Sequence, residues 1–276
     1  MGEVLSELSK DSFGRIGLGV FSLFLLLALV SPLITGDPML HSTSVLNPPS
    51  SEHMLGTNDV GQDIWSRLIR GVRTSILVAV GVGILTTLIG AIVGVSAGLI
   101  GGIYDEVLMR IVDALLAIPA IVVLILIASF LRPTLWTLIL LISILHWQGG
   151  ARIMRAQTLS LKERAYISAA RAFGAGGGYL ILKHVMPGLG PILISSFIYS
   201  ARMAVFMEAG LAFIGIADPT TVSWGAMMHH ALKFYYLPVW KWWLLPPGAA
   251  LSLLILSFTF LGYSLERIIE PRLRNA

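Results

Sequence analysis

The sequence predicts an all-α membrane protein whose chain crosses the bilayer six times. The composition is the first observation, because 56% of the 276 residues are hydrophobic and only 12% are charged, whereas soluble domains are about 45–50% apolar and about 25% charged. The second observation is that uncharged runs recur along the chain, and most approach or exceed the ~20 residues that a spanning helix needs. These runs occupy residues 16–36, 74–104, 114–131, 133–151, 185–201 and 242–265.

The first run is interpreted as a retained transmembrane helix, residues 16–36, after a short tail of residues 1–15. A secretory signal peptide is the alternative, but the run is long and no Ala-x-Ala cleavage site follows it. Residues 37–73 then form an external segment. Its last part, residues 64–74, has an amphipathic pattern and is expected to lie flat as an elbow in the membrane interface, with Ile64, Leu68 and Ile69 toward lipid.

Residues 74–265 form a core domain of five transmembrane helices. In the first of these, Gly90, Gly94 and Gly98 recur at four-residue spacing, which leaves a smooth groove for a neighbouring helix. Gly101 and Gly102 are expected to end that helix.

The next two runs, 114–131 and 133–151, are short and meet at Arg132-Pro133. Proline disfavours helix continuation, so a tight helical hairpin is expected there. The run at 185–201 must continue through Arg202 and Glu208 if it is to cross the bilayer. Ionisable groups at membrane depth are usually functional or paired.

Basic residues indicate the orientation. The connection at residues 152–187 contains one acid, Glu163, against six bases: Arg152, Arg155, Lys162, Arg164, Arg171 and Lys183. The positive-inside rule therefore places this loop in the cytoplasm. Counting spans in both directions puts both termini there as well, including the tail of residues 266–276. The external segment fits the rule poorly, since it carries Arg67, Arg70 and Arg73.

The cytoplasmic loop is expected to contain a short helix. Residues 167–173 are rich in alanine, and Gly174 with the glycines at 176–178 would stop the helix. Residues 179–185 could form a second turn before Pro187 opens the next span. Such a unit is too small to fold alone and needs a partner surface, because it exposes Ala169, Ala170, Phe173, Ile181 and Leu182.

These residues resemble a known family. The stretch SAARAFGAGGGYLILKHVMP, from Ser168, resembles the coupling loop of ABC importer permeases, although Ser168 stands where the family usually has a glutamate. The resemblance continues over nearly the whole chain in LGTNDVGQDIWSRLIRGVRTSI from Leu55, MRIVDALLAIPA from Met109, EAGLAFIGI from Glu208, SWGAMM from Ser223, WWLLPPG from Trp242 and EPRLR from Glu270. As an ordered set, these motifs are similar to those of the dipeptide, oligopeptide and nickel group of binding-protein-dependent permeases.

The resemblance implies a type I ABC importer permease fold and a division of labour. Two homologous permeases would form the pore, two cytoplasmic ATPases would each receive one coupling helix and use ATP and Mg²⁺, and an extracellular solute-binding protein would deliver the cargo. No cofactor, metal or nucleic acid is expected on this chain itself. The implied ATPase-coupling residues are Ser168, Ala169, Ala170, Arg171, Phe173, Gly174 and Pro187.

The expected cargo is a dipeptide or oligopeptide, with nickel or another small solute as the alternative. Arg202 and Glu208 are candidates for the translocation path, and the alternative is that each finds a structural partner on another helix. The group Met227, Met228, His229 and His230 could contact a metal, but such residues in an external segment are more often an interface surface.

Direct nucleotide binding is disfavoured, because the glycines at 174–178 lack the Gly-x-x-x-x-Gly-Lys-Ser/Thr pattern. An enzyme is also disfavoured, since no catalytic triad, paired carboxylates or His-Glu-x-x-His pattern is present. A gradient-driven secondary transporter remains the competing function, although the chain shows no convincing internal repeat of the kind common in those folds.

Overall fold

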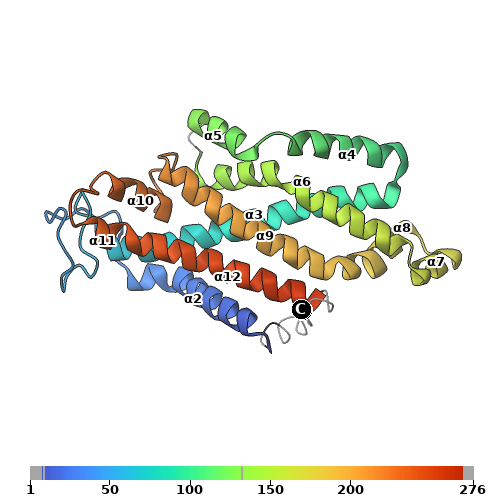
Figure 1. Cartoon of the computed structure of the whole chain (residues 1–276), viewed down its shortest axis with the longest axis horizontal. Coiled ribbons are helices and arrows are strands. Elements are labelled where there is room, and N and C mark those ends of the chain that lie inside the picture. Colours follow the sequence, from blue (N-terminus) through green and yellow to red (C-terminus); the bar gives the residue numbers. More distant parts are fainter. Residues whose placement is uncertain (1–7, 9, 132, 270–276) are drawn as a thin grey trace.

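The chain folds into a bundle of long helices whose axes lie roughly along one common line, with the chain running in both directions (Figure 1). The computed structural model describes residues 8, 10–131 and 133–269. Within these ranges all regular structure is helical. The long helices are α2 (Ser12–Ile34), α3 (Ile64–Ile100), α6 (Leu135–Lys162), α9 (Met186–Phe213) and α12 (Leu245–Ile269).

Five stretches of the described chain are long and apolar enough to cross a membrane. Three of them are α2, α3 and α6, and the other two, Gly177–Phe213 and Trp240–Arg267, cover α9 and most of α12. A sixth crossing is possible through α4 (Gly102–Leu116) and α5 (Ala120–Leu131), which together pass the same test but are bent by 73°. The expectation of one uncharged span at 114–131 was therefore wrong in its bounds. Pro119 lies at the break, where a proline ring prevents the helix from continuing straight.

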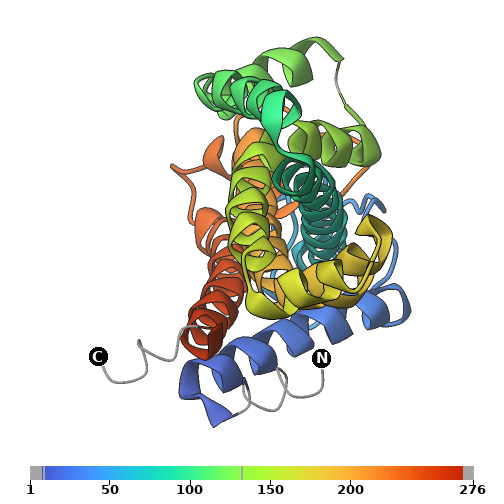
Figure 2. The same ribbon diagram turned by 90° about the vertical axis from the view of Figure 1, so that its right-hand side faces the viewer.

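Helix α3 occupies the centre of the bundle and packs against α2, α6 and α9. Helices α2 and α4–α5 lie on opposite sides of this core, as the end-on view shows (Figure 2). The largest buried cluster joins α2, α3, α9 and α12 around Trp224, which is fully buried. The core thus connects helices that are far apart in sequence.

The glycine ladder of α3 faces α6, as the four-residue spacing predicted. A Cβ atom on Gly90 would lie 3.1 Å from the backbone nitrogen of Ala151, and one on Gly98 would lie 2.9 Å from Thr158. Between them, Gly94 lies against the backbone of Ala151 and Arg155. Small residues at these three positions let the two helix backbones approach closely. Helix α3 then ends at Gly101, which has φ of 72°, as expected.

The short elements lie at the two ends of the bundle. The α7 end carries α7 (Ala165–Ala172), α8 (Gly177–Leu180) and a π-helical turn, η1 (Ile181–Val185). The α10 end carries the loop of residues 35–63, α10 (Trp224–Leu232) and α11 (Trp240–Trp243) (Figure 1). An ion pair of 3.6 Å between Asp11 and Arg267 places the start of α2 beside the end of α12.

The segment expected to be an interfacial elbow is instead the first part of α3, which runs unbroken from Ile64. Ile64 and Ile69 do not face lipid, because both are buried in the protein, and Leu68 is packed against the central cluster. Asp63 begins the helix by accepting a hydrogen bond of 2.7 Å from the backbone N–H of Ser66.

The boundary expected between the fourth span and the basic loop was also wrong. Helix α6 continues to Lys162, so Arg152, Arg155 and Lys162 are helical residues. Arg155 forms a two-point ion pair with Asp105 of α4, at 2.5 and 2.6 Å, and Arg152 pairs with Asp113 at 2.5 Å. The two aspartates lie outside residues 152–187. Counting charges within that segment therefore did not reveal that they neutralise two of its arginines.

The Asp105–Arg155 pair is expected to stabilise the attachment of α4. Its side chains are 13% and 31% exposed, so Asp105→Asn should lower the free energy of unfolding by about 1.5–3 kcal/mol, the usual net worth of a hydrogen bond to a charged group. Thermal unfolding in detergent, followed by tryptophan fluorescence, measures the change. Glu106→Gln is the control, because Glu106 is 67% exposed and pairs with an exposed arginine, and such pairs contribute little. Equal effects of the two changes would contradict this assignment.

Candidate functional site

Helix α7 is held against the bundle by one face. Ile167 is only 1% exposed and packs in a cluster with Met154 and Leu161 of α6 and Leu189 of α9. The cluster is completed by Val95, Leu180 and Val185. Because the anchor reaches both α6 and α9, α7 is positioned by two of the long helices and not by its flanking loops alone.

The opposite face of α7 is uncovered. Ser168 and Ala169 are exposed, and Phe173 at the end of the helix is 93% exposed. Ala170 is half-buried against the anchoring cluster, so it divides the two faces. Of the other expected coupling residues, Pro187 is exposed, while the Arg171 side chain lies outside the described part of the structure. Phe173 is thus an apolar side chain at the end of the uncovered face, where it is available to a partner surface.

Gly174 ends α7, as the sequence predicted. It has φ of 85°, in the left-handed region where glycine pays no Cβ penalty. The backbone N–H of Ala175 then bonds to the carbonyl of Ala170 at 3.0 Å, the reversed hydrogen bond of a Schellman motif. This closure fixes where Phe173 projects.

The expected turn at 179–185 is present as α8 and η1, which continue directly into α9. Pro187 lies in the first turn of α9, directly after η1. His184 lies in this connection, with the rings of Tyr166 and Tyr179 each centred 5.7 Å from its own. Residues 173–176 separate α7 from α8, and from Gly177 onward the chain is helical into α9.

Arg202 lies on α9 beside a groove that α9 forms with α12. Its Nη1 atom donates a hydrogen bond of 3.4 Å to Thr259 of α12, and its guanidinium lies 5.3 Å from the ring centre of Tyr199. Within the described ranges no carboxylate forms an ion pair with it. Arg202 is thus a cation inside a spanning helix that has no anionic partner there.

Glu208, two turns further along α9, is in a different environment. It is only 4% exposed, its carboxyl group is hydrogen-bonded by the Ser223 side chain, and its Oε2 atom has no partner among the described residues. Ser223 also caps α10 by accepting from the backbone N–H of Ala226 at 3.2 Å. Glu208 therefore lies within the packing of this chain, where it joins α9 to the start of α10, and it does not share the groove of Arg202.

Helix α10 is fixed to the rest of the bundle by polar contacts. Trp224 donates its indole N–H to the carbonyl of Leu68 at 2.9 Å, and Thr74 donates to the carbonyl of Val222 at 2.7 Å. Met227 is buried in the core, and His229 contacts the carbonyl of Phe213 at 2.7 Å. The rings of His229 and His230 lie 5.5 Å apart, and among the described residues no group of three or more histidine, aspartate or glutamate side chains could hold a metal.

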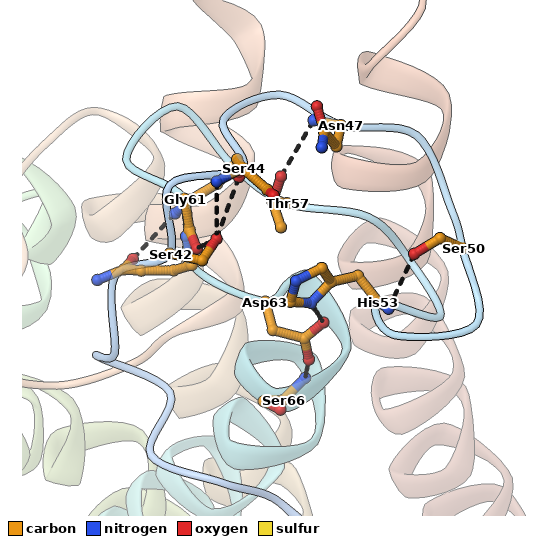
Figure 3. Close-up of polar contacts among 11 residues, drawn as sticks. Ser42, Ser44, Asn47, Ser50, His53, Thr57, Gly61, Asp63 and Ser66 are labelled. Atoms are coloured by element: carbon orange, nitrogen blue, oxygen red, sulfur yellow. Dashed lines mark hydrogen bonds and ion pairs between the residues drawn. The ribbon is translucent and has the colours of Figure 1, made fainter.

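The loop of residues 35–63 has an ordered polar network that the sequence reasoning missed (Figure 3). His53 bonds to Asp63 at 2.9 Å, Asn47 donates its backbone N–H to Thr57 at 3.0 Å, and Ser42 donates to the carbonyl of Gly61 at 2.8 Å. Gly56 and Gly61 could have indicated an ordered loop from the sequence, because they adopt φ of 71° and 77°, a conformation that favours glycine. These hydrogen bonds give the loop a defined conformation at the α10 end.

Comparison of the sequence with known proteins shows which family this chain belongs to. Residues 87–275 match the model of the family described as binding-protein-dependent transport system inner membrane component. The chain belongs to this family. It is accordingly a multi-pass inner-membrane permease subunit of an ABC importer, with an all-helical fold.

Two relatives match almost all of the chain. A putative peptide transport system permease protein of Brucella suis biovar 1 is 36% identical over 267 residues, which are 94% of this permease and 88% of the relative. The oligopeptide transport system permease protein OppC of Bacillus subtilis is 33% identical over 278 residues, 99% of this permease and 90% of the relative. The similarity therefore includes the spans, α7 and the segments at both ends.

Proposed function

We propose that this permease carries dipeptides or oligopeptides across the membrane in an ATP-driven importer and that α7 is its contact with an ATPase subunit. The observation that carries the proposal is the arrangement of α7, with Ile167 buried against α6 and α9 and Phe173 left 93% exposed. The peptide cargo is supported by the names of the relatives, which are peptide and oligopeptide permeases.

The coupling is mechanical in this proposal. The ATPase cleft receives Ser168, Ala169 and Phe173, and movement of the ATPases on ATP binding shifts α7 as a rigid piece. The shift crosses the short turn of residues 173–176 and reaches α9 through α8 and η1, which lead into α9 without a break. Packed elements switch between discrete arrangements instead of deforming continuously, so a short anchored helix is suited to this transfer.

The α7 end faces the cytoplasm in the proposed orientation, and both termini lie on that side. The exposed basic side chains at this end, Arg164 and Lys183, support the assignment. Arg152 and Arg155 are weaker evidence for this orientation, because each forms an ion pair with an aspartate of α4. The α10 end then lies outside, and its ordered loop of residues 35–63 meets the extracellular binding protein.

A second, homologous permease completes the translocation path. This chain contributes α9, with Arg202 beside the path, while Glu208 supports the path from within by holding α10. Two ATPase subunits that use ATP and Mg²⁺ supply the energy, and this chain itself performs no catalysis. The exposed apolar residues of α4 and α5, among them Ile103 and Phe130, are available to lipid or to the second permease.

Uptake by the intact complex tests the proposal. The complex is purified from its own membrane, reconstituted in liposomes with ATP inside, and supplied with its binding protein and a mixture of radiolabelled di- and tripeptides. Accumulation that requires ATP supports the function. Uptake of Ni²⁺ and not of peptides would select the nickel alternative, and uptake driven by a proton gradient without ATP would select the secondary transporter.

A further inference from the structure

The groove between α9 and α12 has a volume of about 210 Å³. Its α9 wall includes Ser195, Tyr199 and Arg202, and its α12 wall includes Thr259, Tyr263 and Glu266. Each set lies on one face of its helix, because its members are three, four or seven residues apart. The groove is therefore a defined feature of two packed spans.

Polar atoms in this groove lack protein partners. A guanidinium has five N–H donors, and within the described residues that of Arg202 makes a single long hydrogen bond, to Thr259. The hydroxyl of Ser195 is buried and has no partner in the part of the chain that the structure describes. Arg202 is only partly buried, so its remaining N–H donors are available to a polar ligand that enters the groove.

The two ends of the groove carry opposite charges. Helices α9 and α12 are antiparallel, because α9 runs from the α7 end to the α10 end and α12 runs back (Figure 1). Arg202 and Thr259 are consequently at the end of the groove nearer α10, and Glu266 is at the end nearer α7. The charged residues are about 10 Å apart along the helix axes, given the 1.5 Å rise per residue.

This spacing fits a short zwitterion. An extended chain spans at most about 3.3–3.6 Å per residue, so two or three residues cover the distance once the reach of the arginine and glutamate side chains is included. The rings of Tyr199 and Tyr263 flank the path between them and offer apolar faces to side chains of any kind. Recognition of the two termini alone would accept many peptide sequences.

The depth of Arg202 disfavours a lipid headgroup as the ligand. Along α9 the residue is roughly 17 Å from Phe213 and roughly 24 Å from Met186, at 1.5 Å per residue. Headgroup phosphates lie at the membrane surfaces, whereas ionisable side chains at depth usually face a protein interior or a water-filled cavity. The unpaired cation is thus placed for a solute that passes through the membrane.

We propose that this groove is a peptide-binding subsite in which Arg202 binds the terminal carboxylate and Glu266 binds the terminal ammonium group. The inference rests on the proposed function and adds the chemical group that the permease recognises. Arg202 is suited to its role because a guanidinium can bind a carboxylate through two parallel hydrogen bonds.

The test measures ATP-dependent uptake by the reconstituted complex with an excess of unmodified binding protein. Two cargoes are compared for each variant, a dipeptide with a free carboxylate and the same dipeptide with an amidated carboxyl end. Arg202→Gln should reduce uptake of the free dipeptide by roughly tenfold or more, in line with the loss of a charge-assisted hydrogen bond. It should leave uptake of the amidated dipeptide unchanged, while Arg202→Lys should restore part of the activity toward the free one. The binding protein's own preference cancels, because each variant is compared with the wild type on the same cargo.

Arg110→Gln is the matched control, because Arg110 is exposed on α4 and pairs with Glu106, and it should change neither rate. Equal loss for both dipeptides, or no loss for either, would overturn the subsite. If the loss instead depended on anionic phospholipid in the liposomes and not on the peptide carboxylate, a lipid phosphate would be the ligand and the inference would be wrong. Wild-type complex that takes up neither dipeptide with ATP contradicts the proposed function itself, and the inference with it.

Discussion

The change Phe173→Asp is expected to release the ATPase subunits from the permease while leaving the helix bundle intact. Phe173 is 93% exposed, so its replacement removes almost no packing within this chain. At an interface, a large aromatic side chain that fills a pocket commonly contributes about 2 kcal/mol or more, equivalent to about a thirtyfold loss of affinity. A buried carboxylate in the ATPase cleft would add to the loss.

Two measurements separate docking from folding in this variant. The ATPase recovered with the affinity-purified permease should fall, and the thermal unfolding midpoint of the permease should not. Tyr235→Ser is the control, because Tyr235 is also exposed but lies between α10 and α11, at the other end of the bundle. If Phe173→Asp retained the full amount of ATPase and normal uptake, α7 would not be the docking helix.

The change Gly94→Leu is expected to disrupt the fold itself. A Cβ atom at this position already overlaps the carbonyl oxygen of Ala151 and would lie 2.7 Å from Met154 and 2.9 Å from the backbone nitrogen of Arg155. The obstacles are partly backbone, so only separation of α3 from α6 can relieve them. The cost should be at least about 3 kcal/mol, the upper part of the range for overpacked cores.

The yield of monodisperse protein and its unfolding midpoint measure this effect. Gly149→Leu provides the control, since Gly149 is also a glycine within a spanning helix but has open space around its Cβ position. Comparable losses from the two substitutions would mean that inserting any large side chain into a spanning helix is harmful, and the close contact of α3 with α6 would not be the cause.

The sequence was sufficient for the features that depend on local pattern. Apolar runs predicted the long helices, because crossing a bilayer requires a continuous stretch of such residues. The spacing of Gly90, Gly94 and Gly98 predicted a close helix contact, and Gly174 predicted the end of α7. Each of these is decided by residues that are near one another in the chain.

The features that the sequence did not reveal depend on contacts between distant segments. Arg152 and Arg155 looked like loop residues until α4 supplied Asp113 and Asp105 as partners. Ile64 had the pattern of a lipid-facing residue, yet it is covered by the rest of the bundle. The groove at Arg202 likewise forms only when α12 lies beside α9, and neither helix alone indicates it.

Site-specific crosslinking from α7 to the ATPase tests the central claim most directly. The chain has no cysteine, so Ala169→Cys introduces a single reactive site on the exposed face of α7, and Tyr235→Cys introduces one at the α10 end. Each variant is labelled with a maleimide photocrosslinker in the purified complex and irradiated with and without ATP. We predict an adduct with the ATPase from position 169, changed in yield by ATP, and none from position 235. An adduct from position 235 and none from 169, in a complex that retains its ATPase, would contradict the account.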